Sequence, residues 1–175
     1  CLVIATTAVT PEPDYYWRDF DGSIPSDAVL GTNDQEVNTY VGNAGIYGGG
    51  LLIGQLFPND SYITVTGKPE PVQTTDKFVK ILCSQHPELL QWFPVNSDTF
   101  DTIPFHLVQG GWEVNPPIDI YDGIIHVGRV LHNNRMVIGK VIGYENGAGH
   151  WLYFHDGDEE LHATEYEILV YDIPR

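Results

Sequence analysis

Short runs of alternating apolar and polar residues dominate the chain and predict β-strands. Residues 62–66 place Ile63 and Val65 on one face, with turn residues on both sides of the run. The runs at 151–154 and 166–170 are equally short and rich in the aromatic and β-branched residues that strands favour. Only residues 87–91 have a helical pattern. We therefore predict an all-β fold of the sandwich or barrel type.

An internal repeat is the second pattern in the sequence. Four matches occur in the same order, three at separations of 85 to 87 residues and one at 75. They pair residues 40–43 with 126–129, 52–55 with 137–140, 79–82 with 166–169, and Trp17 with Trp92. We predict two tandem, diverged β repeats that pack about a pseudo-two-fold axis as one domain, because neither copy is long enough to bury its apolar face alone. Residues 15–84 form the first repeat, 85–172 the second, and 1–14 an N-terminal extension or strand.

The charge balance excludes several classes of partner. The 175 residues contain 24 Asp and Glu against 8 Lys and Arg, a formal net charge of −16. Nucleic-acid affinity comes largely from cationic side chains that displace counterions, so we expect no nucleic-acid partner. Anionic membrane surfaces are disfavoured for the same reason. No apolar run approaches the length that spans a bilayer, so we also expect no membrane insertion.

The two cysteines leave two alternatives open. Cys1 and Cys83 could form one disulfide, or Cys1 could be a free terminal thiol and Cys83 a buried one. The apolar opening at 1–9 fits the remnant of a signal sequence or a first strand. Asn59 begins an Asn-Asp-Ser glycosylation sequon in a turn-like context. Together these features favour a secreted or extracellular protein, with a cytoplasmic one as the alternative.

The ordered motifs resemble the DM-nine repeat family of invertebrate proteins. The second copy carries Val-Gly-Arg at 127–129, Gly-Lys-Val at 139–141 and Tyr-Glu-Ile-Leu at 166–169. The first copy departs from this pattern, with Asn43 in place of Arg and Gln55 in place of Lys. The resemblance covers roughly residues 15–171.

The resemblance implies a fold of two intertwined repeats and a sugar site. Several family members bind mannose without a metal ion, through an Asp ahead of the Val-Gly-Arg strand and the Lys of Gly-Lys-Val. In this chain the matching residues are Asp119 and Lys140, and Asp34 and Gln55 have the same spacing in the first copy. A carboxylate that accepts and an ammonium that donates can together hold two sugar hydroxyls. An ordinary surface ion pair is the alternative for Asp119 and Lys140.

Two further residues are candidates for the lining of the site. Arg129 could line it or could instead clamp a carboxylate between strands, and Trp112 is the tryptophan expected nearest to a loop. His150 and His155 would fall on opposite faces of a strand, which is poor geometry for one metal ion. The chain lacks nucleophile and phosphate-loop signatures. We therefore expect no enzyme activity, metal or cofactor.

The sequence thus favours a metal-independent lectin of the mannose type. It would bind neutral glycans in recognition or innate defence, and a homodimer would supply avidity. The alternative is a secreted structural or protein-interaction module that has lost its sugar site, a view that Asn43 and Gln55 favour.

Overall fold

The computed structural model describes residues 12–34, 37–114, 123–143 and 149–174. These residues form strands joined by turns, with two short 3-10 helices. The elements are β1 (Tyr16–Asp19), β2 (Leu30–Asp34), β3 (Val37–Ile46), β4 (Gly50–Leu56), β5 (Ile63–Thr66), β6 (Val72–Thr75), β7 (Val79–Cys83), η1 (Pro87–Leu89), β8 (Leu90–Asn96), η2 (Ser97–Thr102), β9 (Phe105–Leu107), β10 (Gln109–Glu113), β11 (Ile124–His132), β12 (Arg135–Gly143), β13 (His150–Asp156), β14 (Glu159–Ala163) and β15 (Glu165–Pro174). The predicted all-β fold is confirmed. No helix in this described part is both long and apolar enough to cross a membrane.

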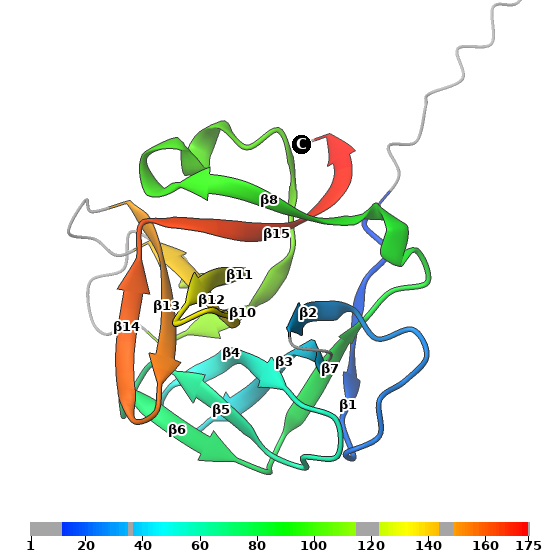
Figure 1. Cartoon of the computed structure of the whole chain (residues 1–175), viewed down its shortest axis with the longest axis vertical. Coiled ribbons are helices and arrows are strands. Elements are labelled where there is room, and N and C mark those ends of the chain that lie inside the picture. Colours follow the sequence, from blue (N-terminus) through cyan, green and yellow to red (C-terminus); the bar gives the residue numbers. More distant parts are fainter. Residues whose placement is uncertain (1–11, 35–36, 115–122, 144–148, 175) are drawn as a thin grey trace, which may run out of the picture.

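All strands belong to one antiparallel sheet that curls around on itself. Its main path runs β1-β7-β3-β4-β10-β11-β12-β13-β14, and β15 joins through β11, β8 and β9. Strand β2 pairs with β3, and β5 pairs with β4 and β6. Figure 1 shows β8 and β15 side by side at the top, β13 and β14 at the left, and β5 and β6 at the bottom.

The pairing registers of the two halves correspond at the matched sequence positions. The corresponding pairs are Gly42↔Gly54 and Gly128↔Gly139, Gly42↔Ile81 and Gly128↔Ile168, and Trp17↔Leu82 and Trp92↔Leu169. Each half therefore uses its Val-Gly and Gly-Lys or Gly-Gln motifs in equivalent hairpins. The pseudo-two-fold axis and the repeat boundaries stay predictions.

The glycine of the Gly-Gln motif in the first half and of the Gly-Lys motif in the second half has no room for a side chain. A Cβ atom on Gly54 would lie 2.3 Å from the Thr64 carbonyl oxygen, and one on Gly139 would lie 2.1 Å from the Tyr153 carbonyl oxygen. Real Cβ atoms do not approach so closely, so any side chain would push the neighbouring strand away.

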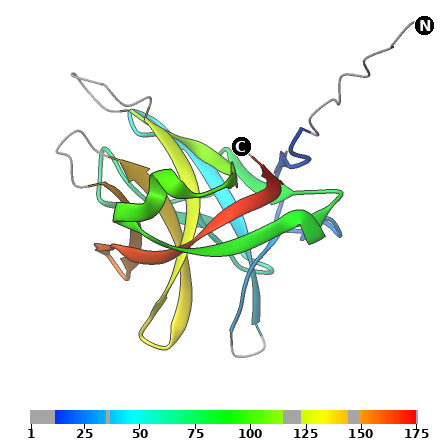
Figure 2. The same ribbon diagram turned by 90° about the horizontal axis from the view of Figure 1, so that it is seen from above.

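Six strands form a ring with one open seam. Strands β2, β3, β4, β10, β11 and β12 follow one another through hydrogen-bonded ladders. The ring would close between β2 and β12, which lie next to each other, but no ladder joins these two strands. Figure 2 shows β2 and β3 extending to the same side of the molecule as β11 and β12.

One core cluster draws on both halves of the chain. It contains Val41 and Ile53 from the first half and Val127, Ile138 and Leu169 from the second, each at most 2% exposed. A second cluster gathers around β15 and β13. The two halves thus share a hydrophobic interior.

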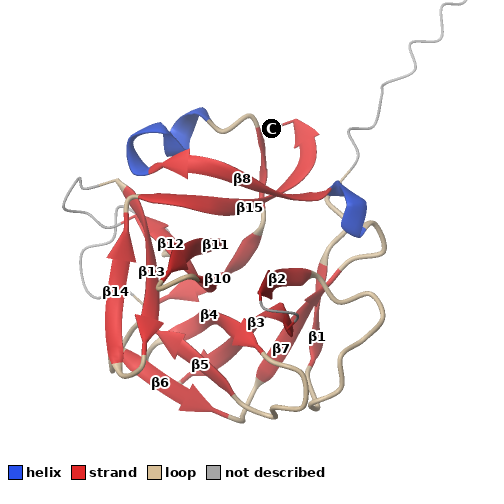
Figure 3. Cartoon of the chain, in the orientation of Figure 1, coloured by secondary structure: helices blue, strands red, loops and turns tan. Residues whose placement is uncertain are grey.

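The helical segments agree in part with the sequence. The predicted turn of helix is present as η1, and a second one, η2, was not predicted; the two flank β8 (Figure 3). Asn96 starts η2, because its side chain accepts a hydrogen bond from the Asp98 N–H at 3.0 Å and forms a capping box with Thr99.

Candidate functional site

The open seam between β2 and β12 is bridged by side chains. The Asp34 carboxylate accepts a hydrogen bond from the Met136 N–H. The Gln55 Oε1 atom accepts one from the Ile138 N–H at 3.3 Å. Buried backbone groups need hydrogen-bond partners. These two side chains therefore accept hydrogen bonds from β12 that the carbonyl groups of a neighbouring strand would otherwise accept.

A pocket of about 710 Å³ opens at this seam. It lies among the end of β2, the start of β3, the β4–β5 turn and the β11–β12 and β13–β14 turns. We call it the polar pocket; its lining includes Asp34, Gln55, Asp60, Tyr62, Arg135 and Asp156. Asp34 and Gln55, paired in the sequence by spacing, therefore share one cavity.

Gln55 is held at this site by two buried threonines. Its Nε2 atom donates to the Thr39 Oγ1 at 2.7 Å and to the Thr32 Oγ1 at 3.4 Å. The two threonine hydroxyls lie 2.7 Å apart and are at most 3% exposed. The Gln55 amide therefore has a fixed orientation.

Several polar groups of the pocket have no protein partner. Within the described ranges, no hydrogen bond or ion pair reaches the side chains of Asp60, Tyr62 and Arg135, or the Oδ1 atom of Asp34. The aromatic rings of Phe57 and Tyr62 are 44% and 48% exposed. The pocket thus offers acceptors, a cationic donor and aromatic surface at one place.

On the opposite wall of the polar pocket, Asp156 contacts two neighbouring polar residues. Its Oδ2 atom lies 3.0 Å from the His132 Nε2 and accepts a hydrogen bond from the Asn133 Nδ2 at 3.1 Å. These contacts tie the β11–β12 turn to the end of β13.

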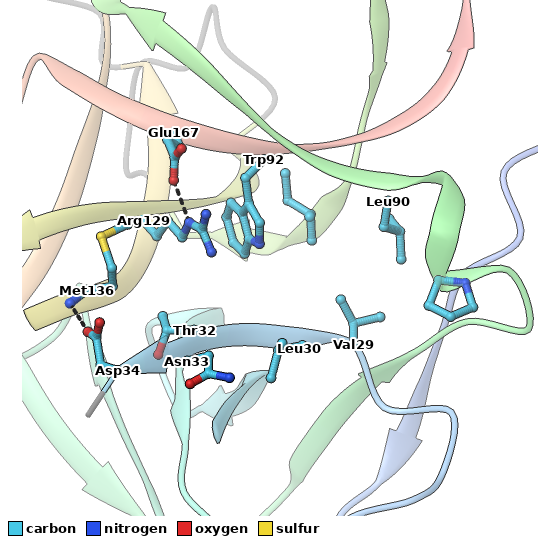
Figure 4. A pocket seen from close by; sticks show the side chains of 12 residues that line it. Val29, Leu30, Thr32, Asn33, Asp34, Leu90, Trp92, Arg129, Met136 and Glu167 are labelled. Carbon is cyan, nitrogen blue, oxygen red and sulfur yellow. Dashed lines mark hydrogen bonds and ion pairs between the residues drawn. The ribbon is translucent and has the colours of Figure 1, made fainter. Parts of the chain in front are cut away.

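A second cavity of about 610 Å³ continues along β2 toward β8 and β15 (Figure 4). We call it the apolar pocket; its walls include Leu30, Pro87, Leu90, Trp92, Arg129 and Leu169. The Arg129 Nε donates to Glu167 at 2.6 Å, and its guanidinium lies 4.3 Å from the centre of the Trp92 ring. Of the two roles left open for Arg129, it performs the clamp between β11 and β15 and also lines a cavity.

Lys140 lies in the interior. Its side chain is 1% exposed, and its Nζ donates to Glu113 at 2.7 Å and lies 3.7 Å from Glu160. The expectation of a surface cation, available to a sugar or to an exposed ion pair, is therefore wrong. The ammonium also lies 5.4 Å from the centre of the Tyr153 ring, a cation–π contact.

Burial perturbs the acids around Lys140. Desolvation raises the pKa of Glu160, although the Lys140 charge opposes the shift. Desolvation together with the charges of Glu160 and Glu113 raises the pKa of Tyr153 to about 12.

Glu113 is the residue that the spacing argument missed. Asp119 lies outside the described residues. The strand register instead shows that Glu113 in the second half corresponds to Asp34 in the first half. Gly31 lies three residues before Asp34, and Gly110 lies three residues before Glu113. Each of these glycines lies at a β-bulge next to a long hairpin. The sequence itself contained only the shared spacing, a glycine three residues before an acidic residue in each half; the bulges are visible only in the structure.

The remaining predicted residues fall away from the polar pocket or at its edge. Trp112 is 49% exposed on β10 and lines neither cavity. Asn59, in the predicted sequon, is exposed in the β4–β5 turn with φ of 72°. Cys83 is a free buried thiol, and burial raises its pKa to about 11. Cys1 lies outside the described residues.

Comparison with models of known protein families finds no match, and a search of curated proteins finds none. The DM-nine resemblance therefore stays a prediction that depends on the quoted motifs. No group of three or more metal-ligating His, Cys, Asp or Glu side chains occurs in the part of the chain that the structure describes.

Proposed function

We propose that this protein binds neutral glycans in the polar pocket, by recognition and without chemical conversion. The observation that carries the proposal is the set of unpartnered polar groups on Asp34, Asp60 and Arg135, beside the exposed rings of Phe57 and Tyr62. Small-molecule sites typically measure about 300–1,000 Å³ and place a few polar groups around apolar surface. The polar pocket has both properties.

The pocket matches the chemistry of a sugar ring. Each hydroxyl group both donates and accepts, so the carboxylates of Asp34 and Asp60 can accept from hydroxyls while Arg135 donates to them. Bonds to charged groups are stronger than neutral ones. An amphipathic ring such as Tyr62 can cover the apolar face of the sugar.

Charge favours neutral ligands over acidic ones. The pocket holds the carboxylates of Asp34, Asp60 and Asp156 against the single guanidinium of Arg135, in a chain of net charge −16. A sialylated or sulfated glycan would meet like charge, which is costly at a binding surface.

The resemblance supports the finer part of the proposal. It favours mannose-type glycans, an extracellular location, a role in recognition or innate defence, and a homodimer that supplies avidity to a weak single site. We place the site at Asp34 and Gln55 rather than at Lys140, because the Lys140 ammonium is buried against Glu113.

A glycan array on the wild type and two aromatic variants tests this proposal. Tyr62→Ala removes a ring of the polar pocket, and Tyr47→Ala is the matched control because Tyr47 is fully exposed and lies outside it. We expect binding to mannose-rich glycans that drops about two- to twelvefold in Tyr62→Ala only, since loss of one stacked ring costs about 0.5–1.5 kcal/mol. A wild type that binds no glycan, or equal losses in both variants, would favour the protein-interaction module instead.

A further inference from the structure

The polar and apolar pockets adjoin each other; we call the two together the groove, and each pocket one end of it. Thr32, Asp34 and Met136 line both cavities. Figure 4 shows how the apolar end continues from these residues along β2, with Leu30 and Val29 facing Leu90 and Trp92 across the cavity. A ligand that fills the polar end and extends past Asp34 and Met136 would therefore reach the apolar end.

Two charged groups of the apolar end, Arg129 and Glu167, are paired with each other. Arg129 donates to Glu167 at 2.6 Å and, through Nη1, to the Gly31 carbonyl oxygen at 2.8 Å. It also lies over Trp92 at 4.3 Å. The Asp34 Oδ2 atom accepts from the Met136 N–H. The Asp34 Oδ1 atom, in contrast, has no such partner among the described residues and lies where the two pockets meet.

The surface open at this end combines hydrocarbon with the exposed amide of Asn33. Leu30 is 44% exposed on β2, and Leu90 and Trp92 are half-buried on β8, with Pro87 of η1 exposed beside them. Covering such surface is favourable by about 0.8 kcal/mol per methylene group. In the described part of the chain, free polar groups are also present at this wall, the Asn33 amide and the Asp34 Oδ1 atom among them, so a second sugar is the competing occupant that the experiment has to test.

We propose that the groove binds an amphiphilic glycoconjugate: a neutral sugar in the polar pocket, joined to an apolar aglycone that lies between Leu30 of β2 and Leu90 of β8. This inference builds on the proposed glycan binding. It adds the chemical class of what is attached to the sugar, an alkyl or aryl group rather than a further saccharide.

Calorimetric titration with three mannosides separates the possibilities. The probes are methyl α-mannoside, hexyl α-mannoside and methyl α-1,2-mannobioside. We expect the hexyl glycoside to bind at least tenfold more tightly than the methyl one, since each buried methylene contributes about a fourfold gain. The mannobioside should gain little.

Two leucine variants locate the effect. Leu30→Thr should abolish the hexyl gain and leave the affinity for methyl mannoside unchanged. The matched control is Leu131→Thr, because Leu131 is 65% exposed on a strand and lines neither cavity; it should keep the gain. Tyr62→Ala should weaken both glycosides, whereas nonspecific adsorption of the hexyl chain would survive it.

The outcomes distinguish this inference from the proposed function. Equal affinities for methyl and hexyl mannoside would overturn the inference and leave glycan binding intact. A gain with the mannobioside instead of the hexyl glycoside would also overturn it, in favour of a second sugar subsite. Absence of binding by all three probes would contradict glycan binding of this type itself.

Discussion

At the scale of single residues, the buried charge on Lys140 makes the fold sensitive to substitution. Its side chain and that of Glu113 are each 1% exposed, and their atoms meet at 2.7 Å. Removal of one partner from a buried ion pair leaves an unpaired buried charge, which costs far more than loss of an exposed pair. The lysine of the Gly-Lys-Val motif thus joins β12 to β10.

We predict that Lys140→Met lowers the free energy of unfolding by about 3–5 kcal/mol. Lys80→Met is the matched control, because it breaks the exposed pair between Lys80 and Asp19 and should cost no more than about 1 kcal/mol. Urea denaturation measures both. If Lys140→Met does not fold, the double variant with Glu113→Leu should recover a folded state, and similar small losses in both single variants would contradict the assignment.

The pH dependence of stability should report Glu160. Burial raises its pKa above the ordinary value of 4.5, so the folded state binds this proton more tightly than the unfolded state does. The resulting stabilisation is complete below about pH 4.5 and is lost as the pH rises through the raised pKa. We predict that Glu160→Gln gains stability relative to the wild type between pH 4 and pH 7, measured by urea denaturation across that interval. A constant difference would contradict the raised pKa.

At the scale of elements, the motif glycines set the distance between strands. Gly139→Ala should lower the free energy of unfolding by about 1–3 kcal/mol, because its Cβ would lie 2.1 Å from the Tyr153 carbonyl oxygen. Gly45→Ala is the matched control on β3, since its Cβ would make an ordinary contact of 3.4 Å with Phe78. Thermal or urea unfolding of both variants checks this, and equal effects would show that Gly139 is not sterically required.

The strands could be predicted from the sequence because their side chains alternate locally. Ile63 and Val65 are 1% and 0% exposed, as their alternation indicated. The seam between β2 and β12 could not be predicted, since its contacts join residues about 80–100 positions apart, such as Asp34 and Met136. Helix η2 was missed because its signal is a single capping box in a polar segment.

The candidate site was predictable in part. Asp34 and Gln55 were paired by spacing and share one pocket. Lys140 was assigned to a sugar site because it occupies the Lys position of the Gly-Lys-Val motif, and the sequence did not identify Glu113 as its partner across 27 residues. Tyr62, Asp60 and Arg135 were missed because only the fold brings the β4–β5 turn, which holds Asp60 and Tyr62, next to Arg135 at the start of β12.

At the scale of the whole molecule, the acidic surface should select against acidic glycans. The chain has a net charge of −16, and the polar pocket has more carboxylates than cations. We predict that α2,3-sialylation weakens binding at least tenfold relative to the same neutral glycan, in paired spots on one array. Salt should reduce this discrimination, since exposed charges are screened. Equal signals for both glycans at low salt would contradict the electrostatic part of the account.

The central claim is that a neutral sugar binds in the polar pocket between the two long hairpins, and amide chemical-shift mapping tests it most directly. Methyl α-mannoside is titrated into the nitrogen-15-labelled protein, and the shifted amides are assigned. The account predicts that the largest shifts cluster at Asp60, Tyr62, Asn133 and Arg135. Shifts centred on Glu113 and Lys140, or no shifts at saturating sugar, would contradict it.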